Sequence, residues 1–323
     1  MLTKAEVRID VTERVGSGAR LEMAATVVAA TRPLPHPSIV CFAFPGGGYN
    51  RRYFDLQFSG RPRYSQAEHH AEQGLVFVAC DHLAVGESSV PETPLDEGQV
   101  VVANVALVDG VLARLAAGAI DGIPPLPAPV TIGMGQSYGG LLLILQQAAH
   151  RVFDGVAMLG WSAIRTVVPV ADGRDVSIAF GEVPTSGLEH PFRHAFHFTD
   201  VDEALVEEDL RGWPYRMGTP VPRWAATSLP GGPHAAIRDP VALHTVAAEA
   251  AAIDVPVFIG NGEIDVCPDP RAEPGAYARS PDITTFILPR SAHMHNFAGT
   301  RKLLWDRLAA WAQGVAATYR VRK

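Results

Sequence analysis

The sequence contains few cysteines, and those it has are isolated from one another. Cys41, Cys80 and Cys267 are the only three in 323 residues, and no CxxC or Cys/His zinc spacing occurs. An odd, scattered set excludes a disulfide framework and the common structural zinc sites. We therefore expect a reducing compartment, most simply the cytoplasm.

A basic patch and a long apolar run are also missing. The formal net charge is −7, and no stretch is rich in Lys or Arg, which argues against a nucleic-acid-binding protein. No stretch approaches ~18 consecutive apolar residues, so no membrane span is expected. The opening residues, "MLTKAEVRIDVTERV", alternate apolar and polar side chains, unlike a signal peptide. Neither nucleic acid nor a membrane is therefore expected as a partner.

The chain has instead the composition and the rhythm of a layered α/β protein. It is 47% hydrophobic and 19% charged, which suits a packed globular chain. Residues 5–11 and 20–28 alternate and predict an antiparallel pair around "GSG". Short apolar runs predict strands buried on both faces, at 38–44, 75–80, 130–134, 155–161, 255–260 and 284–288. Helical patterns lie at Asp96–Ala117, Tyr138–Arg151, Pro270–Arg279 and Thr300–Ala317. The predicted fold class is α/β, with a mostly parallel central sheet flanked by helices.

One interval breaks this alternation. Residues 165–252 contain no buried-strand run but carry helical patterns at 199–212 and 239–252. About 85 residues without a strand is too long for a loop inside a compact domain. We therefore predict a helical cap insertion at 165–252, inserted into a core formed by residues 1–164 and 253–323.

The most specific motif is G-x-S-x-G, at Gly135 to Gly139, between an apolar strand pattern and an apolar helix pattern. In this context the turn is so tight that the residues two before and two after the serine must be small. The serine hydroxyl is then exposed at the start of the helix, where negative charge is favoured. Ser137 is therefore predicted as a nucleophile; the alternative is a capping serine in a Gly-rich turn.

A serine nucleophile needs a base, and the base needs a carboxylate that orients it. Asp265 and His293 each follow one of the last two apolar runs. Because the carboxyl ends of parallel strands share one edge of the sheet, both side chains are expected near Ser137. The alternatives nearby are Glu263 and Asp269 for the acid and His295 for the base.

With these residues the chain resembles the α/β-hydrolase fold serine hydrolases, of esterase or lactonase type, over nearly all its length except the insertion. The family's G-E-x-D acid loop is similar to "GEID", which implies Asp265, and its histidine loop is similar to "SAH", which implies His293. "DHLAVGESS", from Asp81, is similar to a D-x-x-G-x-G-x-S loop of the family, with Ala84 where glycine is frequent; we interpret it as a structural turn. The family often carries a cap domain where the insertion lies.

The resemblance also gives a role to "PGGG", at the end of the run 38–44. The family binds the oxyanion with the N–H after the nucleophile, here Tyr138, and with one from a loop that commonly reads H-G or H-G-G-G. Gly47 is the expected second donor, with Gly46 and Gly48 as alternatives. Pro45 stands where the histidine is usual. Because the donors are backbone groups, the oxyanion hole is expected to persist.

Other side chains receive weaker assignments. Four aromatic residues are predicted to contact substrate, with the internal core of the cap as the alternative for the last three: Tyr49, Trp213, Tyr215 and Trp224. Three histidines at near-helical spacing have no acidic residue in register, so no metal site is expected there: His190, His194 and His197.

The implied activity is cleavage of a carboxylic ester or lactone through an acyl-enzyme on Ser137, without cofactor or metal. The same triad serves acyl transfer or cleavage of a C–C bond beside a carbonyl. A non-catalytic small-molecule binder on the same fold is the alternative from another class. A small-molecule ester or lactone is the expected partner, and the sequence leaves open whether the chain forms a homodimer.

Overall fold

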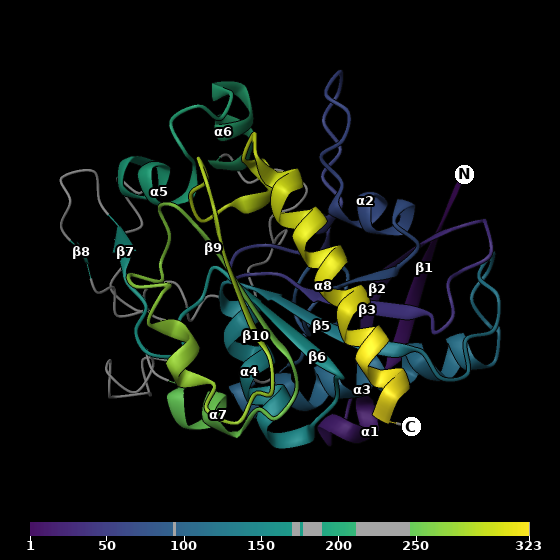
Figure 1. Cartoon of the computed structure of the whole chain (residues 1–323). Helices are drawn as coiled ribbons and strands as arrows, with labels where there is room; N and C mark the ends of the chain where they lie inside the picture. The colour runs from purple at the N-terminus through teal and green to yellow at the C-terminus, as the bar shows by residue number, and fades with distance from the viewer. Residues whose placement is uncertain (93–94, 170–174, 177–188, 211–245, 323) are drawn as a thin grey trace.

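The structure is a computed structural model that describes residues 1–92, 95–169, 175–176, 189–210 and 246–322. An eight-stranded sheet forms its centre (Figure 1). The strands lie in the order β1-β2-β4-β3-β5-β6-β9-β10.

All eight predicted strands are present. β1 pairs antiparallel with β2, and β2 antiparallel with β4, while all later neighbours are parallel. The strands are β1 Leu2–Asp10, β2 Glu22–Ala30, β3 Ile39–Phe44, β4 Val76–Cys80, β5 Val130–Gln136, β6 Gly155–Leu159, β9 Val257–Gly262 and β10 Ile283–Leu288. The mostly parallel sheet and its antiparallel N-terminal pair are therefore confirmed.

Helices cover both faces of the sheet. On one face the apolar core includes residues of α3 (Glu97–Ala116), α4 (Tyr138–His150) and α7 (Ala247–Ala252). On the other it includes residues of α2 (Gln66–Glu72) and α8 (Arg301–Arg322), and α8 crosses in front of the strands in Figure 1. The sheet is thus the middle layer of three.

The central strand β3 is buried on both of its faces. Val40 and Phe42 belong to one core cluster, Cys41 and Ala43 to the other, and all four have no exposed surface. Side chains alternate between the two faces of a strand. A strand covered on both sides therefore reads as a continuous apolar run, which is the pattern found in the sequence.

Two helix predictions differ from the structure. The helix predicted at Pro270–Arg279 is wrong: only a 3-10 turn, η5 (Glu273–Ala276), forms there. Pro274 lacks an N–H and Gly275 is a poor helix former, so the segment makes turns instead. Helix α2 was not predicted. Ser65 is its N-cap, with Oγ accepting from Glu68 N–H (3.0 Å), and serine is a preferred N-cap residue.

A short helix, α1 (Thr12–Val15), joins the first two strands. In the predicted insertion the structure describes α5 (Glu189–Phe196), α6 (Glu203–Leu210) and a two-stranded ladder of β7 (Val168–Pro169) with β8 (Asp175–Val176). Helix α6 lies inside the first predicted helical pattern, and α7 ends the second. Residues 170–174, 177–188 and 211–245 of the predicted insertion lie outside the described residues, and its boundaries stay a prediction.

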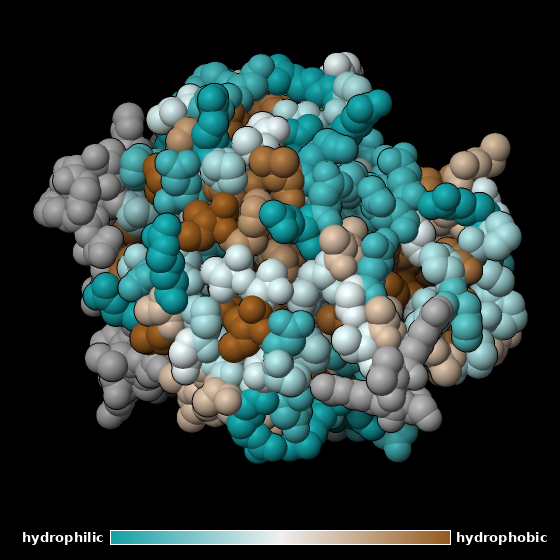
Figure 2. Space-filling model, in the orientation of Figure 1, coloured by the Kyte–Doolittle hydropathy of each residue, from teal (hydrophilic) through white to brown (hydrophobic). Residues whose placement is uncertain are grey.

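Few large apolar side chains are exposed in the described chain: Met1, Val90, Ile164 and Leu303. On the face in Figure 2, apolar residues form small patches separated by polar ones. Among the described helices, α3 alone is long and apolar enough to cross a membrane by length and composition. Of its most apolar window 56% is buried within the protein, and a core helix passes the same test.

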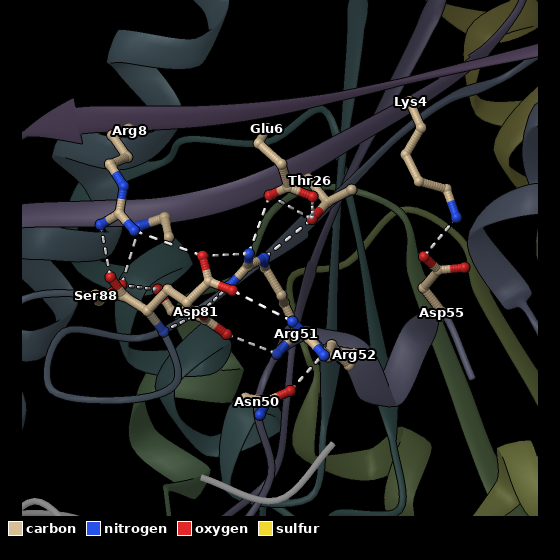
Figure 3. A network of polar contacts seen from close by, with 12 residues as sticks. Lys4, Glu6, Arg8, Thr26, Asn50, Arg51, Arg52, Asp55, Asp81 and Ser88 are labelled. Carbon is tan, nitrogen blue, oxygen red and sulfur yellow. Dashed lines mark hydrogen bonds and ion pairs between the residues drawn. The ribbon is translucent and has the colours of Figure 1, made fainter. Parts of the chain in front are cut away.

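A buried ion pair fastens the segment after the "PGGG" run to the sheet (Figure 3). Arg51, in the 3-10 turn η1 (Arg51–Phe54), pairs through its guanidinium with Asp81, and its backbone N–H donates to the same carboxylate at 2.7 Å. The guanidinium also donates to Thr26 Oγ1 (2.9 Å) and to Glu6 (3.0 Å). Arg51 thereby connects the first two strands with the end of β4.

The loop after β4 closes over the Asp81 carboxylate. The N–H of Glu87 donates to Asp81 Oδ2 (2.9 Å), and a Cβ at Gly86 would lie 2.3 Å from that oxygen. Ala84 has φ 68°, in the left-handed region that glycine prefers. The residue thus occupies a glycine-like backbone position, and the loop encloses a structural ion pair.

Candidate active site

Ser137 lies in a strained turn between β5 and α4. Its φ is 54° and its ψ −124°, a region that residues with a Cβ rarely adopt. A Cβ at Gly135 would lie 2.3 Å from the carbonyl oxygen of Gly139, and one at Gly139 would lie 2.4 Å from the carbonyl oxygen of Phe44. No side chain fits at such separations, so both positions require glycine.

The turn presents Ser137 at the N-terminus of α4, where it is half-buried. Its N–H donates to the carbonyl of Leu159 on β6 at 2.7 Å, which ties the turn to the neighbouring strand. The next side chain, Tyr138, reaches away to donate to Glu97 of α3 at 3.1 Å. The first turn of α4 places positive dipole next to the serine.

Asp265 lies just beyond β9 and is buried, with its carboxylate fully engaged. The N–H of Val266 and Nδ1 of His293 bond to Oδ1, each at 2.7 Å. The N–H of Gly262 and Nε2 of His295 bond to Oδ2, at 2.6 and 2.7 Å. Because a carboxylate that accepts four hydrogen bonds is stabilised in its ionised form, Asp265 is suited to hold an imidazole in place.

The same contacts set the pKa of Asp265. Burial alone would raise it, but the two histidines outweigh burial and hold the pKa well below its ordinary range. Asp265 therefore stays ionised at neutral pH. Because its folded-state pKa is depressed, the stability it contributes is present at neutral pH and is lost only as the pH falls far into the acid range.

His293 has the tautomer that a general base requires. A carboxylate only accepts hydrogen bonds, so Nδ1–H donates to Asp265, and in the neutral ring Nε2 carries the lone pair. Nε2 lies 3.5 Å from Nε2 of Gln136, the chain neighbour of Ser137. No hydrogen bond joins Ser137 Oγ to His293, both within the described chain, so the structure brings the predicted base to the serine turn without that bond.

The two histidines on Asp265 are not equivalent. His295 uses Nε2 for Asp265, and its buried Nδ1 has no partner among the described residues. The imidazole of His293 lies against Gly160, where a Cβ would be 3.0 Å from Nδ1. Nε2 of His293 is thus left beside Gln136 and the serine turn, while Glu263 bonds to the N–H of Arg290 (2.8 Å); the choice of His293 as base and Asp265 as acid stays a prediction.

The insertion reaches the histidine loop. The N–H of His293 donates to the carbonyl of Ala195 (3.0 Å), and that of Met294 to the carbonyl of Phe196 (2.9 Å). The ring of Phe196 lies 5.3 Å from the imidazole of His293, centroid to centroid. The end of α5 thus packs directly over the predicted base.

The glycine loop, defined as residues 45–48, lies against the serine turn. A Cβ at Gly46 would be 2.4 Å from Gln136 Oε1 and 2.9 Å from Ser137 Cβ, so glycine is required for this approach. Gly46 is buried, Gly48 is half-buried and Gly47 is exposed. The structure thus brings Gly46 against Ser137, and the choice of Gly47 as oxyanion donor stays a prediction.

The predicted substrate-contacting residues have different outcomes. Tyr49 is 1% exposed, and its hydroxyl donates to Asp209 of α6 at 2.8 Å. The same carboxylate accepts from Nε2 of His197 at 2.7 Å. Tyr49 therefore joins the glycine loop to the insertion, and its contact with substrate stays a prediction. The other three lie outside the described residues: Trp213, Tyr215 and Trp224.

Gln136 and His82 were missed in the sequence. Gln136 is buried between the glycine loop and the histidine loop, and its Nε2 also donates to the carbonyl of His293 at 3.3 Å. His82 is buried beside Pro45. The only signals were a polar residue between a predicted buried strand and the serine for Gln136, and a histidine two residues after another such strand for His82.

Comparisons with known proteins identify the fold. No family model and no curated protein matches the chain. An esterase from Thermogutta terrifontis is similar with a TM-score of 0.65 at 14% identity, covering 96% of this chain and 99% of its own. A putative lipase from Acinetobacter baumannii AYE has a TM-score of 0.65 at 11% identity, covering 98% of this chain and 93% of its own.

The similar structures also include enzymes of other chemistry. A haloalkane dehalogenase variant from Bradyrhizobium elkanii has a TM-score of 0.60 at 12% identity and covers the whole of both chains. Identities this low carry the fold and not the substrate. The sheet order, the elbow turn and these likenesses together show that the chain has the α/β-hydrolase fold.

Proposed function

We propose that the chain is a serine hydrolase that cleaves a carboxylic ester or a lactone through an acyl-enzyme on Ser137. The observation that carries the proposal is the half-buried serine in a glycine-bounded, strained turn, close to an imidazole whose tautomer is fixed by Asp265. An esterase and a putative lipase among the similar structures support the same class of reaction.

The residues define the steps. His293 Nε2 takes the proton of Ser137 Oγ as that oxygen attacks the carbonyl carbon. The negative charge that develops on the carbonyl oxygen is stabilised by backbone N–H groups of Tyr138 and the glycine loop. His293 gives its proton to the leaving alcohol, whose C–O bond breaks. A water molecule, deprotonated by His293, then attacks the acyl-enzyme and releases the acid.

The first experiment is a panel of p-nitrophenyl esters of graded acyl length, together with simple lactones. We expect hydrolysis of at least one member, and covalent labelling by a fluorophosphonate probe. Product analysis with added alcohol separates hydrolysis from acyl transfer. Failure of the wild-type protein to react with any ester, lactone or fluorophosphonate would contradict the proposal and would favour a non-catalytic binder.

The roles of the two histidines can be tested by separate substitution. Substitution His293→Ala is expected to lower kcat by at least about 10³-fold, because it removes the base that activates Ser137. Substitution His295→Ala removes only one of four donors to Asp265, and we expect a loss of about 10-fold or less. Ester hydrolysis rates for both variants measure the difference, and the reverse order would make His295 the base.

A further inference from the structure

The backbone of the glycine loop makes few hydrogen bonds within the described chain. Tyr49 N–H donates to the carbonyl of Gly46 at 3.2 Å. The N–H groups of Gly46, Gly47 and Gly48 have no acceptor recorded within the described chain. Because glycine has the largest backbone freedom of all residues, such a loop holds its shape only if its surroundings hold it.

His82 binds the carbonyl of the first peptide of this loop. It follows β4, is 1% exposed, and its ring stacks on Phe44 with centroids 5.6 Å apart and planes at 19°. Its Nε2 lies 3.1 Å from the carbonyl oxygen of Pro45. A carbonyl only accepts, so Nε2 carries the hydrogen and donates it.

The other side of the ring meets α3. His82 Nδ1 lies 3.1 Å from Asn104 Oδ1, and Nδ2 of the same buried amide has no partner among the described residues. If the amide is turned so that Nδ2 faces the ring, Asn104 donates to His82 Nδ1, and Nδ2 then has a hydrogen-bond partner. Burial lowers the pKa of His82, which favours this neutral, singly protonated ring. Asn104 thus selects the tautomer that donates to Pro45.

Holding one carbonyl orients the loop. The trans peptide between Pro45 and Gly46 is planar, so its C=O and N–H point in opposite directions. With the carbonyl held by His82, the N–H of Gly46 faces away from His82. The same carbonyl approaches Gly139, where a Cβ would be 2.6 Å from it. The peptide is therefore fixed between His82 and the first turn of α4, next to Ser137.

Asp81, the residue before His82, fixes the far end of the same segment. It binds the guanidinium and the backbone N–H of Arg51, six residues after Pro45 in the sequence. Two consecutive residues at the end of β4 thus hold the chain on both sides of the glycines. We propose that His82 is a positioning residue that fixes the Pro45–Gly46 peptide in the orientation that oxyanion binding requires, a role that rests on the proposed function.

The test compares His82→Phe with His82→Gln. Phenylalanine keeps an aromatic ring against Phe44 but cannot donate to Pro45, and we expect kcat to fall about 10- to 100-fold with KM little changed. The side-chain amide of glutamine reaches the position of Nε2, and we expect it to restore kcat to within about 5-fold of wild type. Ester kinetics and thermal midpoints are measured for both variants.

His70 provides the matched control. It is also completely buried. Its Nδ1 lies 2.9 Å from the carbonyl oxygen of Gln66, and its ring centroid lies 5.3 Å from that of Phe77. Within the described chain it makes no contact with the glycine loop. Substitution His70→Phe is expected to lower the thermal midpoint without lowering kcat. Wild-type kcat in His82→Phe, equal kcat losses in His82→Phe and His70→Phe, or no recovery in His82→Gln would each overturn the positioning role. Failure of the proposed function is a separate outcome, visible as an inactive wild-type protein.

Discussion

Substitution Ser137→Ala should reduce ester hydrolysis by about 10³-fold or more and abolish labelling by a fluorophosphonate. The reason is that the Oγ atom forms the bond to the acyl group, and no other hydroxyl takes its place in the turn. Alanine keeps the Cβ and the backbone demands of serine, so the free energy of unfolding should change by less than about 0.5 kcal/mol. Steady-state kinetics, mass spectrometry of the labelled protein and chemical denaturation measure the three effects.

The control is Ser162→Ala. Ser162 is another buried serine at the end of a neighbouring strand, and its hydroxyl donates to Glu273 at 2.7 Å. It is expected to leave labelling intact. Labelling of Ser137→Ala at the wild-type rate would show that the nucleophile lies elsewhere in the chain.

Substitution Arg51→Met should destabilise the fold by about 3–5 kcal/mol at neutral pH, because it leaves the buried Asp81 carboxylate without its guanidinium. Arg51 and Asp81 have side chains 4% and 0% exposed. Burial already raises the pKa of Asp81, and Arg51 opposes that rise. Without Arg51 the pKa rises further, so the loss of stability should shrink as the pH falls below it and Asp81 becomes protonated.

Two variants sharpen this test. Arg52→Ala removes the neighbouring arginine, which is 55% exposed and pairs only with Glu87 at 3.4 Å among the described residues; a change below about 1 kcal/mol is expected. The double variant Arg51→Met/Asp81→Leu removes both charges and should recover part of the stability. Urea denaturation of all four proteins, wild type included, is the measurement. If Arg51→Met lowers the free energy of unfolding no more than Arg52→Ala does, the buried ion pair between Arg51 and Asp81 is not what stabilises this region.

The sequence predicted those parts of the fold in which local pattern and final packing agree. Strand β3 is apolar on both faces because both faces are covered. Its continuous apolar run therefore predicted a buried strand without any knowledge of its neighbours. The serine turn was legible because its geometry demands small residues at Gly135 and Gly139. The nearness of Asp265 and His293 to the serine turn was expected from the parallel topology, which brings their loops to one edge of the sheet.

What the sequence did not predict depends on contacts between distant segments. His82 meets Pro45 only because β4 pairs beside β3 in the sheet. Tyr49 meets Asp209 across 160 positions of sequence, and no local pattern encodes that distance. The helix predicted near Glu273 is wrong for a local reason, because Pro274 and Gly275 disfavour it, and the Glu273 carboxylate is instead buried on Ser162 and Ala163.

The backbone at Ser137 has a consequence for how the sequence evolves. A serine held at φ 54° costs of order 1–3 kcal/mol, which a glycine would largely avoid. Selection for stability alone would therefore replace Ser137 by glycine, since glycine already occupies two of the five positions of the turn. Only selection for the hydroxyl keeps the strained residue. If that selection were relaxed, Ser137 is the first position of the turn where drift would be favourable, so the proposed nucleophile predicts that serine is retained there in every chain that keeps the activity.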